Sequence, residues 1–178
     1  MERLSVARHG ESDYSARGLL NGDPNRRCPL TATGRRQALR LGELLREERI
    51  DLCVTSAFER TRETADLALA GRQIPRLVVA ELNDHPAGEF EGSAIPEYLV
   101  WAHASPSDDP IPGASESRLD ALRRFGRGYR LVQTGADNDG ADVAGDPETG
   151  GSCTSSLNTC FDATGGLNQN IYSASLGS

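Results

Sequence analysis

Ala7-Arg8-His9-Gly10-Glu11-Ser12 is the stretch that decides how this 178-residue chain folds. It follows residues 4–7, which predict a short buried strand, and α/β sheets bind their ligands at the carboxyl ends of such strands. Arg8 can bind a phosphate through two parallel hydrogen bonds, and Gly10 has no side chain that would block the close approach of a tetrahedral anion. The stretch therefore predicts a phosphate pocket in which the imidazole of His9 attacks phosphorus.

Strand and helix patterns alternate around this stretch. Strands are expected at 4–7, 51–55 and 76–80, and helices at about 31–48, 57–70, 94–104 and 115–130. Thr31 or Thr33 is a suitable cap for the first helix, and Ser115 or Ser117 for the last. This alternation predicts an α/β fold of three layers, in which a mostly parallel sheet is flanked by helices.

The composition of the chain changes near residue 131. All 19 basic residues are arginines that precede this point, whereas the remainder is rich in Gly, Ser, Asp and Asn and has few large apolar residues. Such composition is typical of irregular or disordered chain. We therefore expect a domain over residues 1–132 and an irregular tail over residues 133–178.

The charge and the cysteines exclude several classes of protein. The net charge of -7 gives no reason to expect a nucleic-acid or membrane-surface partner, and no apolar run is long enough to span a bilayer. The N-terminus is too short and too polar for a secretory signal, so we expect a cytoplasmic enzyme. The four cysteines match no zinc spacing, and an acidic run at 137–148 lacks the glycine position of a calcium loop. We therefore expect no metal and no organic cofactor, and Cys28 and Cys53 to be ordinary thiols.

Six motifs, in the right order, resemble those of the histidine phosphatase superfamily, which includes the phosphoglycerate mutases. Together they cover residues 4–130. They are Arg8-His9-Gly10-Glu11-Ser12, Asn21-Gly22, the "PLTxxGxxQA" pattern at 29–38, the "SSxxxRxxxTA" pattern at 55–65, the "GxWEG" pattern at 88–92 and a "PGGES"-like pattern at 112–117.

The resemblance implies a role for each matching residue. His9 would form a phosphohistidine, while Arg8 and Arg60 would hold the phosphate oxygens. Asp84, four residues before Gly88, would be the general acid, with Glu81 and Glu89 as rivals. Ser15, Asn21 and Gly22 would contact substrate at the mouth of the pocket. His85 and His103 are expected to be surface or turn residues.

A second phosphate-binding histidine, which the resemblance also implies, is missing. In the family it follows a late strand in the centre of the sheet, but here no histidine follows His103. We therefore expect residues from about 133 onward to differ from the family's C-terminal part, and the fold to be incomplete there. Without the central strand its neighbours would have unpaired backbone groups, which predicts poor stability or rescue by another chain.

These observations favour a phosphomonoesterase that acts on a small phosphorylated metabolite through His9. A phosphoglycerate mutase is the first alternative, but Ser15 and Asp84 stand where mutases commonly carry Asn and Glu. A remnant that only binds phosphate is the second alternative, because the second histidine is missing. The sequence indicates no particular oligomeric state.

Overall fold

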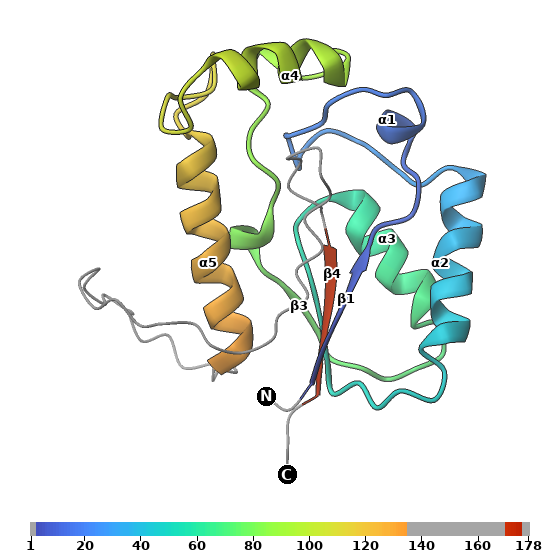
Figure 1. Cartoon of the computed structure of the whole chain (residues 1–178). Helices are drawn as coiled ribbons and strands as arrows, with labels where there is room; N and C mark the ends of the chain where they lie inside the picture. Colours follow the sequence, from blue (N-terminus) through green and yellow to red (C-terminus); the bar gives the residue numbers. More distant parts are fainter. Residues whose placement is uncertain (1–2, 135–169, 176–178) are drawn as a thin grey trace.

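A computed structural model describes residues 3–134 and 170–175 of the chain (Figure 1). Its strands are β1 (Arg3–Arg8), β2 (Leu52–Thr55), β3 (Arg76–Val78) and β4 (Asn170–Ser175). Its α-helices are α1 (Asp13–Ala16), α2 (Ala32–Leu44), α3 (Glu59–Ala68), α4 (Ile95–Ala104) and α5 (Arg118–Thr134), and two short 3-10 helices are η1 (Ala80–Leu82) and η2 (Gly88–Phe90). The acidic run at 137–148 lies outside the described residues, and so do the two remaining cysteines, Cys153 and Cys160.

The four strands form one sheet in the order β1-β4-β2-β3. β2 and β3 are parallel, and β4 is antiparallel to both β1 and β2. It follows that β1, β2 and β3 point in the same direction, as expected, while β4 runs opposite to them, so that β2 and β3 are the parallel pair of the described sheet. In Figure 1, α2 and α3 cover one face of the sheet and α5 covers the other, which confirms the three-layer α/β fold.

The expectation of an irregular tail is wrong for residues 170–175, because they form β4. This strand lies between β1 and β2, where Tyr172 is paired with both Val6 and Val54. Two neighbouring strands with unpaired backbone groups are a strong template for a third, and this pairing outweighs the weak local strand signal of the tail. We expected either poor stability or a central strand from another chain; the structure instead takes the central strand from residues 170–175 of the same chain.

Two of the longer helices, α2 and α5, begin after hydroxyl residues that accept from one of their first backbone N–H groups, whereas α3 and α4 begin without a side-chain cap. Thr31 Oγ1 accepts from Gly34 N–H at 3.1 Å and caps α2, and Ser117 Oγ accepts from Asp120 N–H at 3.1 Å just before α5. The four-residue helix α1 was not expected from the sequence. Among residues 3–134 and 170–175, no helix has both the length and the apolar character needed to cross a membrane.

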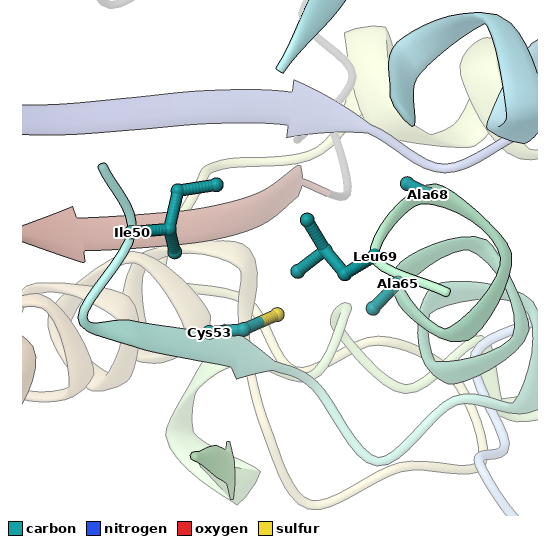
Figure 2. Packing of buried hydrophobic residues seen from close by; sticks show 5 residues of the cluster. All are labelled: Ile50, Cys53, Ala65, Ala68 and Leu69. Carbon is teal, nitrogen blue, oxygen red and sulfur yellow. The ribbon is translucent and has the colours of Figure 1, made fainter. Parts of the chain in front are cut away.

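Residues of β2 alternate between the two faces of the sheet and enter two apolar clusters. Cys53 packs with Ile50, Ala65, Ala68 and Leu69 on the side of α2 and α3 (Figure 2). The next residue, Val54, packs with Val79, Leu82 and Val132, and Val132 comes from α5. Cys28 and Cys53 are buried and form no disulfide within the described residues. Val6 of β1 is 49% exposed, so the expectation of a buried first strand is wrong at this residue.

Candidate active site

His9 follows the last residue of β1 and has a defined tautomer. Its Nδ1 lies 2.7 Å from the carbonyl oxygen of Gly10. A carbonyl oxygen can only accept a hydrogen bond, so the ring proton is on Nδ1 and the nonbonding pair is on Nε2. Nε2 is therefore the atom of His9 that can act as a nucleophile.

The loop that carries His9 is fixed against α2 and α3. Gly10 N–H donates to Thr64 Oγ1 at 3.0 Å, and Thr64 O–H donates to the Arg60 carbonyl at 2.7 Å. The backbone of Gly10 also lies against that of Gly34, so closely that a Cβ on Gly10 would be 2.3 Å from the Gly34 oxygen. A Cβ on Gly34 would likewise be 2.0 Å from the Glu11 oxygen, so these contacts require glycine at both positions and hold the His9 loop against the start of α2.

One cleft, with a volume of about 110 Å³, gathers most of the residues that the sequence singled out. Six of the seven predicted site residues line it: Arg8, His9, Ser15, Asn21, Arg60 and Asp84. Gly22 instead lines a neighbouring hollow with Arg26, Glu91 and Ser115. Three apolar side chains, Leu19, Leu20 and Ile95, also line the cleft, as does Tyr14. The lining therefore combines two arginines and a histidine with apolar side chains.

Arg60 is the buried cation of the cleft. It comes from the first turn of α3, is 3% exposed, and its guanidinium lies 4.0 Å from the ring centre of Phe58. Both terminal nitrogens donate to Asn21, one to the side-chain oxygen and the other to the carbonyl at 3.3 Å. Burial lowers the pKa of Arg60, while the nearby Asp84 opposes this. Arginine begins so far above neutrality that Arg60 remains a cation.

Glu91 bonds to two of the predicted site residues, although no role was predicted for it. Its carboxylate accepts from Asn21 Nδ2 at 2.9 Å and from the Gly22 backbone N–H at 2.7 Å. The first bond fixes the amide of Asn21 so that its oxygen faces Arg60. Glu91 belongs to the "GxWEG"-like turn at 88–92, which is the sequence signal that points to it.

Ser15 and Ser12 make local hydrogen bonds. Ser15 Oγ accepts from Ser12 N–H at 2.7 Å and donates to the Ser12 carbonyl at 3.0 Å, and Ser12 Oγ accepts from Ser15 N–H at 3.2 Å. This reciprocal pair is a capping box at the start of α1. The hydroxyl proton of Ser15 is therefore used within the loop, although the side chain does line the cleft.

Asp84 supplies the carboxyl group of the cleft. Burial raises its pKa, and interactions with the neighbouring His85, Arg60 and Arg124 oppose this rise. The backbone N–H of His85 donates to Asp84 Oδ1 at 3.1 Å and fixes the orientation of the carboxyl. A carboxyl group with a raised pKa holds its proton to a higher pH than usual and can deliver it to a leaving group.

His85 was expected to be a surface or turn residue; it lies in the segment between η1 and η2 but is buried, with only 8% exposed. Its Nδ1–H donates to the Pro86 carbonyl at 3.1 Å, and its Nε2 accepts from the hydroxyl of Tyr98 at 3.2 Å, with the two rings stacked 5.1 Å apart. His103 is exposed on α4, as expected. Among the described residues that line the cleft, His9 is the only histidine.

Similarity to known proteins extends over most of the chain. Residues 4–143 match the sequence profile of the histidine phosphatase superfamily (branch 1). The chain is 40% identical over 89 residues to adenosylcobalamin/alpha-ribazole phosphatase of Salmonella typhimurium, covering 50% of this chain and 43% of that protein. It is 46% identical over 137 residues to the 2,3-bisphosphoglycerate-dependent phosphoglycerate mutase of Mycobacterium leprae, covering 68% of this chain and 55% of that protein.

The fold is similar to that of the alpha-ribazole phosphatase of Shigella flexneri, with a TM-score of 0.64 and 29% identity. That similarity covers 74% of this chain and 68% of the Shigella protein. The chain spans about half the length of the curated relatives described above.

Proposed function

The chain belongs to the histidine phosphatase superfamily (branch 1), and from this premise we propose that it is a phosphomonoesterase that acts on a small phosphorylated metabolite through a phosphohistidine on His9. The observation that carries the proposal is the 2.7 Å contact between His9 Nδ1 and the Gly10 carbonyl oxygen, because a hydrogen bond there leaves the nucleophilic electron pair on Nε2. Arg8, Arg60 and Asp84 line the same cleft.

In the first step, Nε2 of His9 forms a bond to phosphorus while the bond from phosphorus to the alcohol oxygen breaks. The carboxyl proton of Asp84 moves to that oxygen, so the alcohol leaves neutral and Asp84 becomes a carboxylate. Arg8 and Arg60 stabilise the charge that develops on the phosphoryl oxygens. The raised pKa of Asp84 supports its role as the proton donor.

In the second step, water attacks the phosphohistidine and the bond between Nε2 and phosphorus breaks. The Asp84 carboxylate takes a proton from this water, which restores both residues and releases inorganic phosphate. The second histidine of the family is missing, so the transition state has one donor fewer. A lost donor of this kind costs about 3–4 kcal/mol, so we expect turnover to be about 10²–10³-fold slower than with a complete pocket.

Release of inorganic phosphate from a panel of monoesters tests the proposal. The wild-type chain should hydrolyse p-nitrophenyl phosphate slowly, and His9→Asn, which keeps a polar side chain without a nucleophile, should not. Arg62→Lys, an exposed change on α3, serves as the control that should leave the rate unchanged. A chain that folds but hydrolyses none of the esters, or a His9→Asn variant as active as the wild type, would overturn the proposal.

A phosphoglycerate mutase activity is the second candidate, and the observation that favours it is the similarity to the Mycobacterium leprae mutase over 68% of the chain. The chain carries Ser15 and Asp84 at positions where phosphoglycerate mutases commonly carry Asn and Glu. Incubation with 3-phosphoglycerate separates the two activities, because a mutase yields the 2-phospho isomer and a phosphatase yields glycerate and inorganic phosphate.

A further inference from the structure

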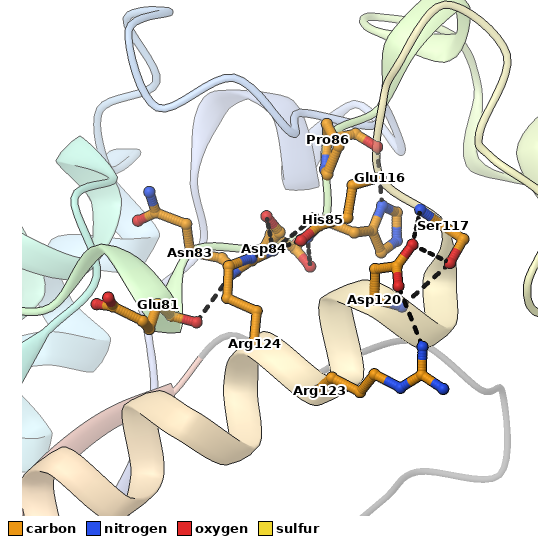
Figure 3. Close-up of polar contacts among 10 residues, drawn as sticks. All are labelled: Glu81, Asn83, Asp84, His85, Pro86, Glu116, Ser117, Asp120, Arg123 and Arg124. Carbon is orange, nitrogen blue, oxygen red and sulfur yellow. Dashed lines mark hydrogen bonds and ion pairs between the residues drawn. The ribbon is translucent and has the colours of Figure 1, made fainter. Parts of the chain in front are cut away.

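The guanidinium of Arg124 connects α5 to the segment that carries Asp84. One terminal nitrogen donates to the carbonyls of Glu81 at 2.8 Å and Asn83 at 2.7 Å, and the other donates to the carbonyl of Asp84 at 3.3 Å (Figure 3). A single side chain thus binds three of the four carbonyls at positions 81–84. The rigid fork of an arginine suits such a cluster, whereas the point charge of a lysine does not.

Glu116 holds Arg124 in this position from the segment before α5. Its carboxylate accepts from Arg124 Nε at 2.7 Å and from a terminal nitrogen at 2.8 Å, a bidentate pair. The two side chains are only 17% and 20% exposed, unlike the solvated ion pairs of the surface. The geometry of Arg124 is therefore fixed from both sides.

Two further contacts make the segment around Asp84 depend on this arrangement. Gly128 of α5 lies so close that a Cβ there would be 2.7 Å from Glu81 Cβ. On the opposite side, the side-chain oxygen of Asn83 accepts from Ala57 N–H at 2.7 Å, which ties the segment to the loop before α3. The segment is thus held between α5 and the loop that precedes α3, and Arg124 makes the polar contacts on the α5 side.

We propose that Arg124 is a positioning residue for Asp84, which keeps the carboxyl where it can protonate the leaving alcohol. This inference rests on the proposed function, since it needs Asp84 as the general acid. Arg124 touches the backbone of the segment and not the reacting atoms. Its removal should therefore affect only the step in which the carboxyl proton is used.

The leaving group of the substrate separates this role from a general structural one. Nitrophenolate is a stable anion and leaves without a proton, whereas benzyl alcohol needs one. The parameter to measure is kcat/KM for p-nitrophenyl phosphate and for benzyl phosphate, because it reports the steps up to departure of the alcohol. Hydrolysis of the phosphohistidine, which is common to both substrates, does not enter it.

Arg124→Gln should lower kcat/KM for benzyl phosphate by about 10²-fold, the cost of misplacing a catalytic group by about 1 Å, and leave that for p-nitrophenyl phosphate nearly unchanged. Arg123→Gln is the matched control, since Arg123 is exposed and bonds only to Asp120 in the described structure. It should change neither value. Equal losses on both substrates with Arg124→Gln, or no loss on either, would overturn the inference.

Arg124→Lys keeps the test open if the glutamine variant does not fold. It retains the charge and most of the length but cannot bind three carbonyls and Glu116 together, so it should show the same selective loss, to a smaller degree.

Asp84→Asn distinguishes failure of this inference from failure of the proposed function. If Asp84→Asn also affects both substrates equally, the assignment of Asp84 as the acid fails. If Asp84→Asn is selective for benzyl phosphate and the Arg124 variants are not, only the role of Arg124 fails. When both assignments hold, the double variant should be no more selective than Asp84→Asn alone, because the two residues act on one step.

Discussion

Replacement of Gly10 with alanine tests whether the packing of the His9 loop on α2 sets the direction of the nucleophile. The new Cβ would lie 2.3 Å from the Gly34 oxygen, 2.9 Å from its carbonyl carbon and 3.0 Å from its Cα. All three are backbone atoms, so no flexible side chain can give way. Ordinary contact begins at 3.4 Å, and the loop or the start of α2 must therefore move by about 1 Å.

Such overpacking costs about 1–3 kcal/mol of unfolding free energy, and a 1 Å displacement of His9 lowers activity by about 10²-fold. Urea unfolding gives the first quantity, and kcat/KM for p-nitrophenyl phosphate gives the second. Gly126→Ala is the control, because a Cβ there meets no atom within 4 Å and alanine in a helix gains up to about 1 kcal/mol over glycine. A Gly10→Ala variant with full activity and stability would show that this contact does not position His9.

Three further perturbations have defined outcomes. Arg60→Lys removes the pair of hydrogen bonds from the two guanidinium nitrogens to Asn21 and should lower kcat/KM about 10²–10³-fold. An Arg62→Lys variant with the same loss would contradict this. Ser173→Pro removes one backbone donor from β4 between its two partner strands and should lower the unfolding free energy, measured in urea, by about 1–3 kcal/mol; an unchanged midpoint would mean that β4 does not stabilise the sheet. The raised pKa of Asp84 predicts that kcat/KM for benzyl phosphate falls as the pH rises through this raised value, and that Asp84→Asn removes that limb.

The same pKa shift has a consequence for stability. A carboxyl group whose pKa is raised by folding binds its proton more tightly in the folded state, so its contribution is complete below the ordinary aspartate value of about 3.9 and is lost as the pH rises through the folded value. Asp84→Asn should not show this loss when unfolding is measured over the same pH range. A wild-type chain whose unfolding free energy rises over that window, relative to the variant, would contradict the direction of the shift.

The sequence was sufficient to predict the framework and six of the residues that line the cleft. The strand before His9 and the helix that carries Arg60 have strong local patterns, and the motifs place both residues near one phosphate. The alternation of patterns likewise predicts the α/β layers, because periodicity reflects which face of each element is buried.

The remaining features depend on contacts between distant segments and have little local signal. β4 forms because β1 and β2 offer backbone partners on both sides, which its own composition does not reveal. His85 is buried because Tyr98 of α4 covers it and bonds to its Nε2. Glu91 and Arg124 act on Asn21 and on the backbone around Asp84 across long stretches of chain, so their roles become visible only in the folded structure.

The central claim is that Nε2 of His9 accepts the phosphoryl group, and trapping the phosphoenzyme tests it most directly. The chain should be mixed with a ³²P-labelled phosphate monoester, quenched rapidly with base and digested for peptide mapping. We expect a label that is stable to base and lost in acid, on the peptide that contains His9, and absent from His9→Asn. Turnover of the ester with no label on that peptide, or an equal label in His9→Asn, would contradict the account.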